Sequence, residues 1–216
     1  HMQPLLEAGK DVLVITFSSG LSGTSGSFVV ACRELAQKYP DRKIRVVDSL
    51  CASMGEGLLL DYVVRKADGG ASLDETADYA EGLKLHICHH FTVDNLFHLK
   101  RGGRVSSTTA ILGSVLKIKP IMHVNNEGKL VAIGKVIGRK KSLKTLVENF
   151  LASMDMDEDD PVFISHGDCM EDVEYVKGLI LEKLPQAKIT VNYIGAVIGT
   201  HSGCGTLAIF NKGKQR

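Results

Sequence analysis

The sequence contains no tryptophan, no apolar run long enough to cross a membrane, and almost no net charge. A spanning helix needs about 20 consecutive apolar residues, so no transmembrane segment is predicted, and no signal peptide is visible. The formal net charge of +1 gives no reason to expect binding to nucleic acid. The five cysteines are widely spaced and form no Cys-x-x-Cys pair, which predicts reduced thiols and a cytoplasmic location.

The chain is rich in glycine, and many of its 22 glycines follow short apolar runs. Apolar, β-branched runs alternate with segments of helical spacing, which predicts an α/β fold. We expect two lobes. Residues 1–85 would form a first α/β lobe with a mostly parallel, three-layer sheet, and residues 86–216 a second lobe with a mixed sheet and helices. His1-Met2 is typical of a cloning remnant and is left out of this reasoning.

The most informative stretch is a strand, a Gly/Ser loop and a helix at residues 12–39. Val12 to Phe17 is a continuous apolar run typical of a buried parallel strand. The next ten residues are mostly serine and glycine, and helical spacing resumes at Phe28. Such a loop lies where open α/β sheets bind ligands, and it suits an anionic group. The alternative is a plain turn with Ser25 or Ser27 as the helix N-cap.

The remaining pattern continues this alternation. Ser72 and Glu75 form a capping-box pattern, Asp94 can cap a short helix that ends at Gly102-Gly103, and residues 195–205 form a second glycine-rich loop. Further strands are expected at 43–47, 85–93, 120–124, 129–137, 162–165, 189–194 and 206–210, and further helices at 58–67, 73–85, 108–116, 142–153 and 171–184.

Two histidine-containing motifs could carry chemistry. His86, Cys88 and His90 alternate along one predicted strand face, which zinc could use, but no fourth ligand is evident and ordinary strand side chains are the simpler interpretation. His166-Gly167-Asp168 follows a strand, where we expect a capping Asp168 and a surface histidine.

Two basic clusters stand near predicted helix ends: Lys100-Arg101 with Arg104, and Arg139-Lys140-Lys141. Such clusters are usually solvated, although arginine can also hold a phosphate or a carboxylate by its planar fork. His201, in the second glycine-rich loop, belongs either to a functional site or to an exposed turn.

An ordered series of motifs resembles the DegV family of bacterial fatty-acid-binding proteins. The resemblance begins with Ser-Ser-Gly-Leu-Ser-Gly-Thr (18–24) and covers nearly the whole chain. This chain departs from the family at its start, because the family's Thr-Asp-Ser and Thr-Ser-Gln-Pro motifs are absent. The resemblance therefore implies a DegV-like fold that lacks the family's first strands. The other motifs lie at 46–49, 99–105, 118–121, 134–141 and 198–205.

The resemblance also implies a function. A long-chain fatty acid would lie in an apolar tunnel between the lobes, with Ser22 and His201 at its carboxylate. A fatty acid kinase would dock and phosphorylate that carboxylate, so the chain would be a carrier and not an enzyme, with no metal and no cofactor. The loop residues Ser19, Gly20, Gly23 and Thr24 would lie beside the ligand, and the kinase-docking residues would be Arg101, Arg104 and Arg139.

Alternative functions remain open on the sequence alone. Ser22 and His201 could form the nucleophile and base of an acyl hydrolase, although no carboxylate is marked as their third partner. The chain could also be a protein-interaction module with a vestigial lipid site. If the first strands are missing, the edge of the strand at Val12 is open, and we expect self-association along it.

Overall fold

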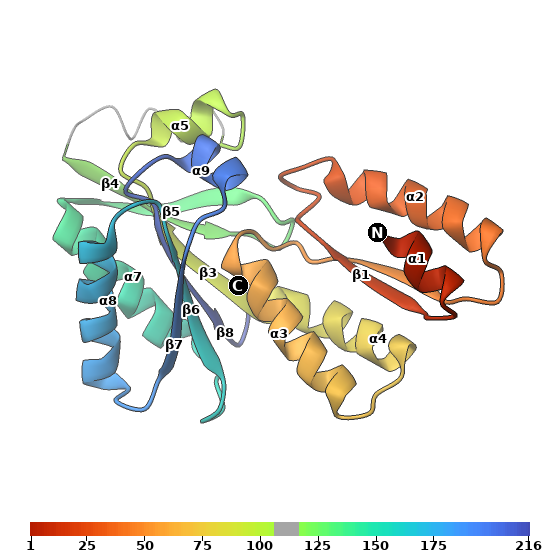
Figure 1. Cartoon of the computed structure of the whole chain (residues 1–216). Helices are drawn as coiled ribbons and strands as arrows, with labels where there is room; N and C mark the ends of the chain where they lie inside the picture. The colour runs from red at the N-terminus through yellow and green to blue at the C-terminus, as the bar shows by residue number, and fades with distance from the viewer. Residues whose placement is uncertain (106–116) are drawn as a thin grey trace.

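The computed structural model describes residues 1–105 and 117–216 and contains two β-sheets with flanking helices (Figure 1). The predicted α/β class is confirmed. The predicted helix at 108–116 lies outside the described residues. None of the helices in the described part of the chain is long and apolar enough to cross a membrane.

The smaller sheet contains two parallel strands, and it pairs Val12 with Ile44 and Thr16 with Asp48. Helices α1 and α2 lie on one side of this sheet, and α3 and α4 lie on the other (Figure 1). Three layers therefore form, as predicted. The elements in chain order are α1 (Met2–Glu7), β1 (Val12–Thr16), α2 (Thr24–Lys38), β2 (Ile44–Asp48), α3 (Met54–Asp68) and α4 (Leu73–Leu83).

The larger sheet has six strands in the order β5-β4-β3-β8-β6-β7. Strands β6 and β7 are parallel and every other neighbouring pair is antiparallel, so the predicted mixed sheet is confirmed. The β4–β5 pair is the predicted hairpin. The strands are β3 (Ile87–Thr92), β4 (Ile118–Val124), β5 (Leu130–Ile137), β6 (Pro161–His166), β7 (Lys188–Tyr193) and β8 (Leu207–Lys212).

Helices cover both faces of the larger sheet. Helices α7 and α8 pack on one face, and α3 packs on the opposite face against β3, β6 and β8. Helices α5 and α9 contact each other at one end of the sheet (Figure 1). These remaining elements are η1 (Lys84–His86), α5 (Leu96–Arg101), α7 (Arg139–Ser153), α8 (Met170–Lys183) and α9 (Ala196–Ser202).

Two hydrophobic clusters hold these layers together. One lies under α7 and α8 and includes the fully buried Phe150. The other contains Val47 of the small sheet, Leu58 of α3 and Phe210 of the large sheet, so α3 is shared between the two sheets. The lobe boundary at residue 85 stays a prediction, although both strands of the small sheet precede it and all six strands of the large sheet follow it.

One predicted helix end is confirmed and others differ from prediction. The capping box at Ser72 and Glu75 is present. The N-cap of α5 is Asn95, whose side chain accepts a hydrogen bond from the Phe97 N–H, so the expectation for Asp94 was wrong. Residues 195–205 are not all loop, because Ala196–Ser202 forms helix α9 between glycines. The high glycine content of this segment hides such a short helix, because a short helix is stabilised mainly by packing against its neighbours and not by its own sequence.

Candidate functional site

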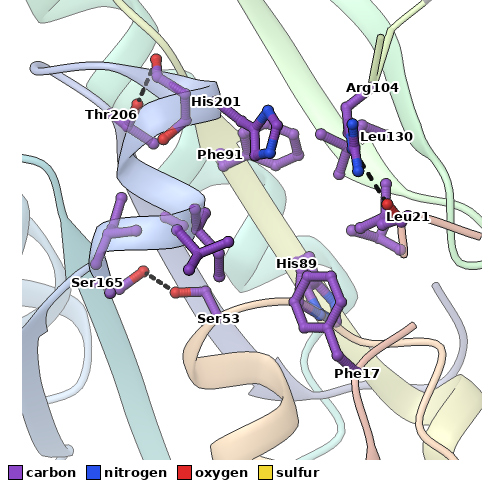
Figure 2. Close-up of a pocket in the computed structure, with 18 of the residues that line it drawn as sticks. Phe17, Leu21, Ser53, His89, Phe91, Arg104, Leu130, Ser165, His201 and Thr206 are labelled. Atoms are coloured by element: carbon purple, nitrogen blue, oxygen red, sulfur yellow. Dashed lines mark hydrogen bonds between the residues drawn. The ribbon is translucent and has the colours of Figure 1, made fainter. Parts of the chain in front are cut away.

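A cavity of about 430 Å³ lies between the larger sheet, the loop after β1 and helix α9 (Figure 2). Its sheet wall carries Phe91 of β3 and Ala208 and Phe210 of β8. Most of its lining is apolar, and its volume is in the usual range for small-molecule sites. The other apolar lining residues are Phe17, Leu21, Ala52, Leu99, Val124, Leu130, Ile194, Ala196, Val197 and Ile198.

The Gly/Ser loop reaches this cavity because it is fastened to the β4–β5 hairpin turn. The buried Ser18 hydroxyl donates to the Gly128 carbonyl at 2.8 Å. A Cβ atom at Gly20 would lie 2.4 Å from the Glu127 carbonyl oxygen, closer than any real contact allows. The Ser19 N–H donates to the Asp48 carboxylate at the end of β2. Glycine at position 20 therefore permits two distant loops to touch.

Two hydroxyls of this loop line the cavity. The Oγ of Ser22 and the Oγ1 of Thr24 lie 2.8 Å apart, and Ser22 Oγ also accepts the Thr24 N–H. Helix α2 begins here, with Gly23 as its N-cap and no side-chain cap. The alternative caps were wrong: Ser25 is buried against Thr16, and Ser27 lies within the helix. Free N–H groups and hydroxyls at a helix start suit an anion.

Arg104 and His201 lie beside these hydroxyls. The Arg104 guanidinium donates to the carbonyls of Leu21, at 3.1 Å, and Gly102 (Figure 2). The His201 ring rests on the Gly102 backbone, where an added Cβ would lie 2.2 Å from its Nδ1. This end of the cavity thus holds a cation, an imidazole and two hydroxyls, all suited to a carboxylate.

His89 of β3 is a polar residue of the sheet wall. Its Nδ1 bonds to the Ile87 carbonyl at 2.9 Å and must carry the proton, while its Nε2 accepts the Ala52 N–H at 3.2 Å. Burial holds the pKa of His89 well below its usual value, so the ring is neutral. Its partner Ala52 lies between β2 and α3, so this ring joins the two sheets.

A second polar spot lies away from Arg104 and Leu21 (Figure 2). Ser53, just before α3, donates to Ser165 of β6 with 3.0 Å between the hydroxyl oxygens. Ser202 of α9 also lines the cavity, is 4% exposed, and has no hydrogen-bond partner for its hydroxyl among the residues described.

Comparison with known proteins identifies the family. A family model described as an uncharacterised protein of the DegV family matches residues 2–213. The chain belongs to the DegV family. A DegV domain-containing protein of Clostridium perfringens is 46% identical over 211 residues, covering 98% of this chain and 72% of that relative.

Solved DegV structures share this fold. A fatty-acid-binding DegV protein from Thermus thermophilus is 29% identical with a TM-score of 0.83, covering 98% of this chain and 74% of its own. A fatty-acid-binding DegV protein from Streptococcus agalactiae is 28% identical with a TM-score of 0.83, covering 99% of this chain and 74% of its own.

The structure of this DegV chain brings only some of the predicted site residues together. Ser22, Thr24, Arg104 and His201 all line the cavity. The other three loop residues are not among its lining residues and act instead in the loop backbone: Ser19, Gly20 and Gly23.

The three predicted docking arginines have different surroundings. Arg101 is exposed at the end of α5, whereas Arg104 bonds to backbone at the cavity. Arg139 pairs with Asp172 at 2.8 Å, and its side chain is 20% exposed. The docking assignment stays a prediction, which Arg101 fits best by exposure.

One histidine of each of the two histidine motifs, His90 and His166, is buried. His90 is buried, its Nε2 lies 2.9 Å from the Ser153 hydroxyl, and burial lowers its pKa to about 4. His166 is 1% exposed, and Asp168 is not the N-cap of α8, so the expectation of a surface histidine with a capping aspartate was wrong. Residues 1–105 and 117–216 contain no group of three potential metal ligands.

The sequence analysis missed His89 and the hydroxyls at Ser53, Ser165 and Ser202. Strand alternation could have identified His89, because a strand that turns Cys88 and His90 to one face turns His89 and Phe91 to the other. No sequence signal brings the three serines together, since they come from three distant elements.

Proposed function

We propose that this DegV protein carries a long-chain fatty acid in the cavity, with the carboxylate at Ser22, Thr24, Arg104 and His201. The observation that supports this most strongly is the arrangement of the lining, in which a cationic, hydroxyl-rich end adjoins an apolar interior. An amphiphile with one charged end and a long apolar tail matches that arrangement.

The energetics favour such a ligand. Each buried methylene contributes about 0.8 kcal/mol, so a sixteen-carbon tail contributes roughly 10 kcal/mol before the costs of binding. A carboxylate cannot be buried without partners. The hydroxyls of Ser22 and Thr24 and the Arg104 guanidinium supply donors at the cavity end. The DegV proteins of Thermus thermophilus and Streptococcus agalactiae, described as fatty-acid-binding, support the same ligand class here.

The proposal makes this chain a cytoplasmic carrier that presents the acid to a fatty acid kinase. A hydrolase is disfavoured because Ser22 Oγ is engaged by Thr24, and the cavity lining contains no aspartate or glutamate among the residues described. The kinase step derives from the family resemblance, with the exposed Arg101 beside the site as the contact of choice. All five cysteines are unpaired, in keeping with the cytoplasmic location.

The experiment is mass spectrometry of lipid extracted from freshly purified, folded protein, compared with a mock purification. We expect a long-chain fatty acid at up to one per chain. Extracts without acid above the mock level, together with no binding of added acid by delipidated protein, would contradict the proposal. A protein that lacks acid but still binds the kinase would instead be an interaction module.

The kinase step has its own test. Arg101→Ala should reduce acyl-phosphate formation by a fatty acid kinase while leaving the lipid content unchanged, because exposed charges at an interface chiefly set the association rate. Lys129→Ala, on the exposed hairpin turn, is the matched control. Equal turnover with all three proteins would place kinase docking elsewhere.

A further inference from the structure

The second polar spot of the cavity suggests which acyl chains this protein selects. We propose that the site takes an oxygenated fatty acid, in which a hydroxyl on the acyl chain bonds to the Ser202 hydroxyl, with the Ser165 hydroxyl as a second donor on the cavity wall. This inference rests on the proposed function, because it concerns the tail of the same ligand.

Ser202 supplies the first observation. Ser202 is only 4% exposed and lines the cavity. Its hydroxyl has no hydrogen-bond partner in the part of the chain that the structure describes. A buried hydroxyl without a partner is costly, so native structures usually provide one. Thr206 bonds to the Ser202 carbonyl and not to its hydroxyl, so the side chain remains available.

Ser165 supplies the second observation. It is fully buried, lines the same cavity and accepts the hydroxyl hydrogen of Ser53. Each hydroxyl has one hydrogen to donate, so a two-serine chain that ends at Ser165 leaves the Ser165 hydrogen free. No acceptor for that hydrogen is found within residues 1–105 and 117–216. Two independent hydroxyls thus offer hydrogen bonds inside a mostly apolar cavity.

The geometry separates this spot from the carboxylate end. Figure 2 shows Ser165 and Thr206 on one side of the cavity, and Arg104 and Leu21 on the other. The Thr206 hydroxyl donates to the Ser202 carbonyl at 3.1 Å, so Ser202 lies on the side of Thr206. A carboxylate held at Arg104 therefore leaves these serines to a later part of the ligand. A plain acyl chain would cover both hydroxyls without bonding to them, whereas a chain hydroxyl can both donate and accept.

The test is a displacement assay on delipidated protein with a fluorescent fatty-acid probe. The competitors are octadecanoic acid and a series of hydroxyoctadecanoic acids with the hydroxyl at successive positions. We expect at least one positional isomer to bind about tenfold more tightly than octadecanoic acid. Ser202→Val should abolish that preference, so that no isomer binds this variant more tightly than octadecanoic acid does.

Thr200→Val is the matched control, because Thr200 is exposed on the same helix and its hydroxyl bonds to the Ala196 carbonyl. The inference is wrong if no isomer exceeds octadecanoic acid, or if the preference survives Ser202→Val. In either case octadecanoic acid would still displace the probe, and fatty-acid carriage would stand. If neither octadecanoic acid nor any isomer displaces the probe, the proposed function itself fails.

Discussion

The two sheets differ in how completely they are covered. In the larger sheet every residue of β3 is buried, and α7, α8 and α3 cover its two faces. In the smaller sheet Leu13, Val14 and Ile15 of β1 are only partly buried, and β1 pairs with β2 alone among the described strands. The larger sheet thus supplies a closed core and one cavity wall, while the smaller sheet presents the Gly/Ser loop to that wall.

A groove of about 710 Å³ runs beside β1, between it and helices α3 and α4. Leu60 and Val64 of α3 line this groove, and each is 47% exposed. Glu56, in the first turn of α3, also lines it. The apolar exposure beside β1 therefore lies next to an acid. In the larger sheet, exposed apolar side chains occur on the edge strands, at Ile137 of β5 and Tyr193 of β7.

The largest expected effect is in the core of the larger sheet. Phe150→Ala should lower the free energy of unfolding by about 3–5 kcal/mol, because Phe150 is fully buried and its removal leaves a cavity. Val14→Ala in β1, a half-buried position, should cost about 1 kcal/mol or less. Urea denaturation measures both. Equal losses would show that the two sheets are equally well packed.

Arg216 joins the two sheets. Its guanidinium donates to the carbonyls of Leu50 at 2.6 Å, Lys84 at 2.7 Å and Ile87 at 3.0 Å. Arg216→Ala should lower stability by about 2–3 kcal/mol, because buried carbonyls lose charged donors. Hydrogen exchange should rise at the end of β2 before it rises in β8. Lys214→Ala is the exposed control, and uniform exchange in both variants would contradict a joining role.

The cavity predicts a smaller effect on binding. Ser22→Ala should weaken fatty-acid affinity by about 1–2 kcal/mol, roughly tenfold, because a buried carboxylate loses one donor. Ser19→Ala, in the same loop but not lining the cavity, should leave affinity unchanged. A displacement assay compares the two variants with the parent protein, and identical affinities would remove Ser22 from the carboxylate site.

Glu56, beside the smaller sheet, should make the stability of the protein depend on pH. Burial, with the nearby Asp48 charge, raises the pKa of Glu56 from 4.5 to about 7. Between these pH values the folded state retains a proton that the unfolded chain has lost, so stability falls as pH rises from about 4.5 to about 7. Glu56→Gln should be more stable than the parent at pH 8 by about 1 kcal/mol, after allowance for solvent screening.

The control for Glu56 is pH 4.5, where the folded-state carboxyl is protonated and the two proteins should differ little. Thermal unfolding in matched buffers at pH 4.5, 6 and 8 measures the difference. A constant offset between the two proteins at all three pH values would contradict titration of Glu56 as the cause.

The open edge of β1 carries the weakest effect. We expect reversible self-association along Val12–Thr16, because an unprotected edge offers free backbone groups beside the apolar groove. Val14→Lys should shift light scattering toward the monomer. Thr190→Lys, on the edge strand β7 of the larger sheet, is the control. A parent protein that is monomeric at high concentration would show that this edge is not adhesive.

Local patterns predicted most of the fold. The apolar run at Val12 became β1, the Asn125–Gly128 turn became the β4–β5 hairpin, and Ser72 with Glu75 formed the capping box. Each of these signals lies within a few residues of its structural consequence. The helix at Ala196–Ser202 and the burial of His166 depend on neighbours from other elements, so spacing along the chain could not reveal them.

Part of the candidate site could also be predicted from the sequence. Ser22 and His201 were identified through the family resemblance and line one cavity. The joining role of Arg216 and the unpartnered hydroxyl of Ser202 are properties of three-dimensional neighbours. The pairing of Arg139 with Asp172 is likewise a contact between distant elements, which the basic cluster in the sequence could not reveal.

The neutral ring of His89 affects the orientation in which a charged ligand can lie in the cavity. Its proton is fixed on Nδ1 by the Ile87 carbonyl, so this histidine brings no charge to the sheet wall. Arg104 is the one lysine or arginine among the described residues that line the cavity. The cavity therefore favours one orientation of an anionic amphiphile. With its charged group at Arg104 the ligand is stabilised, whereas the reversed orientation places that charge against a wall with no compensating cation.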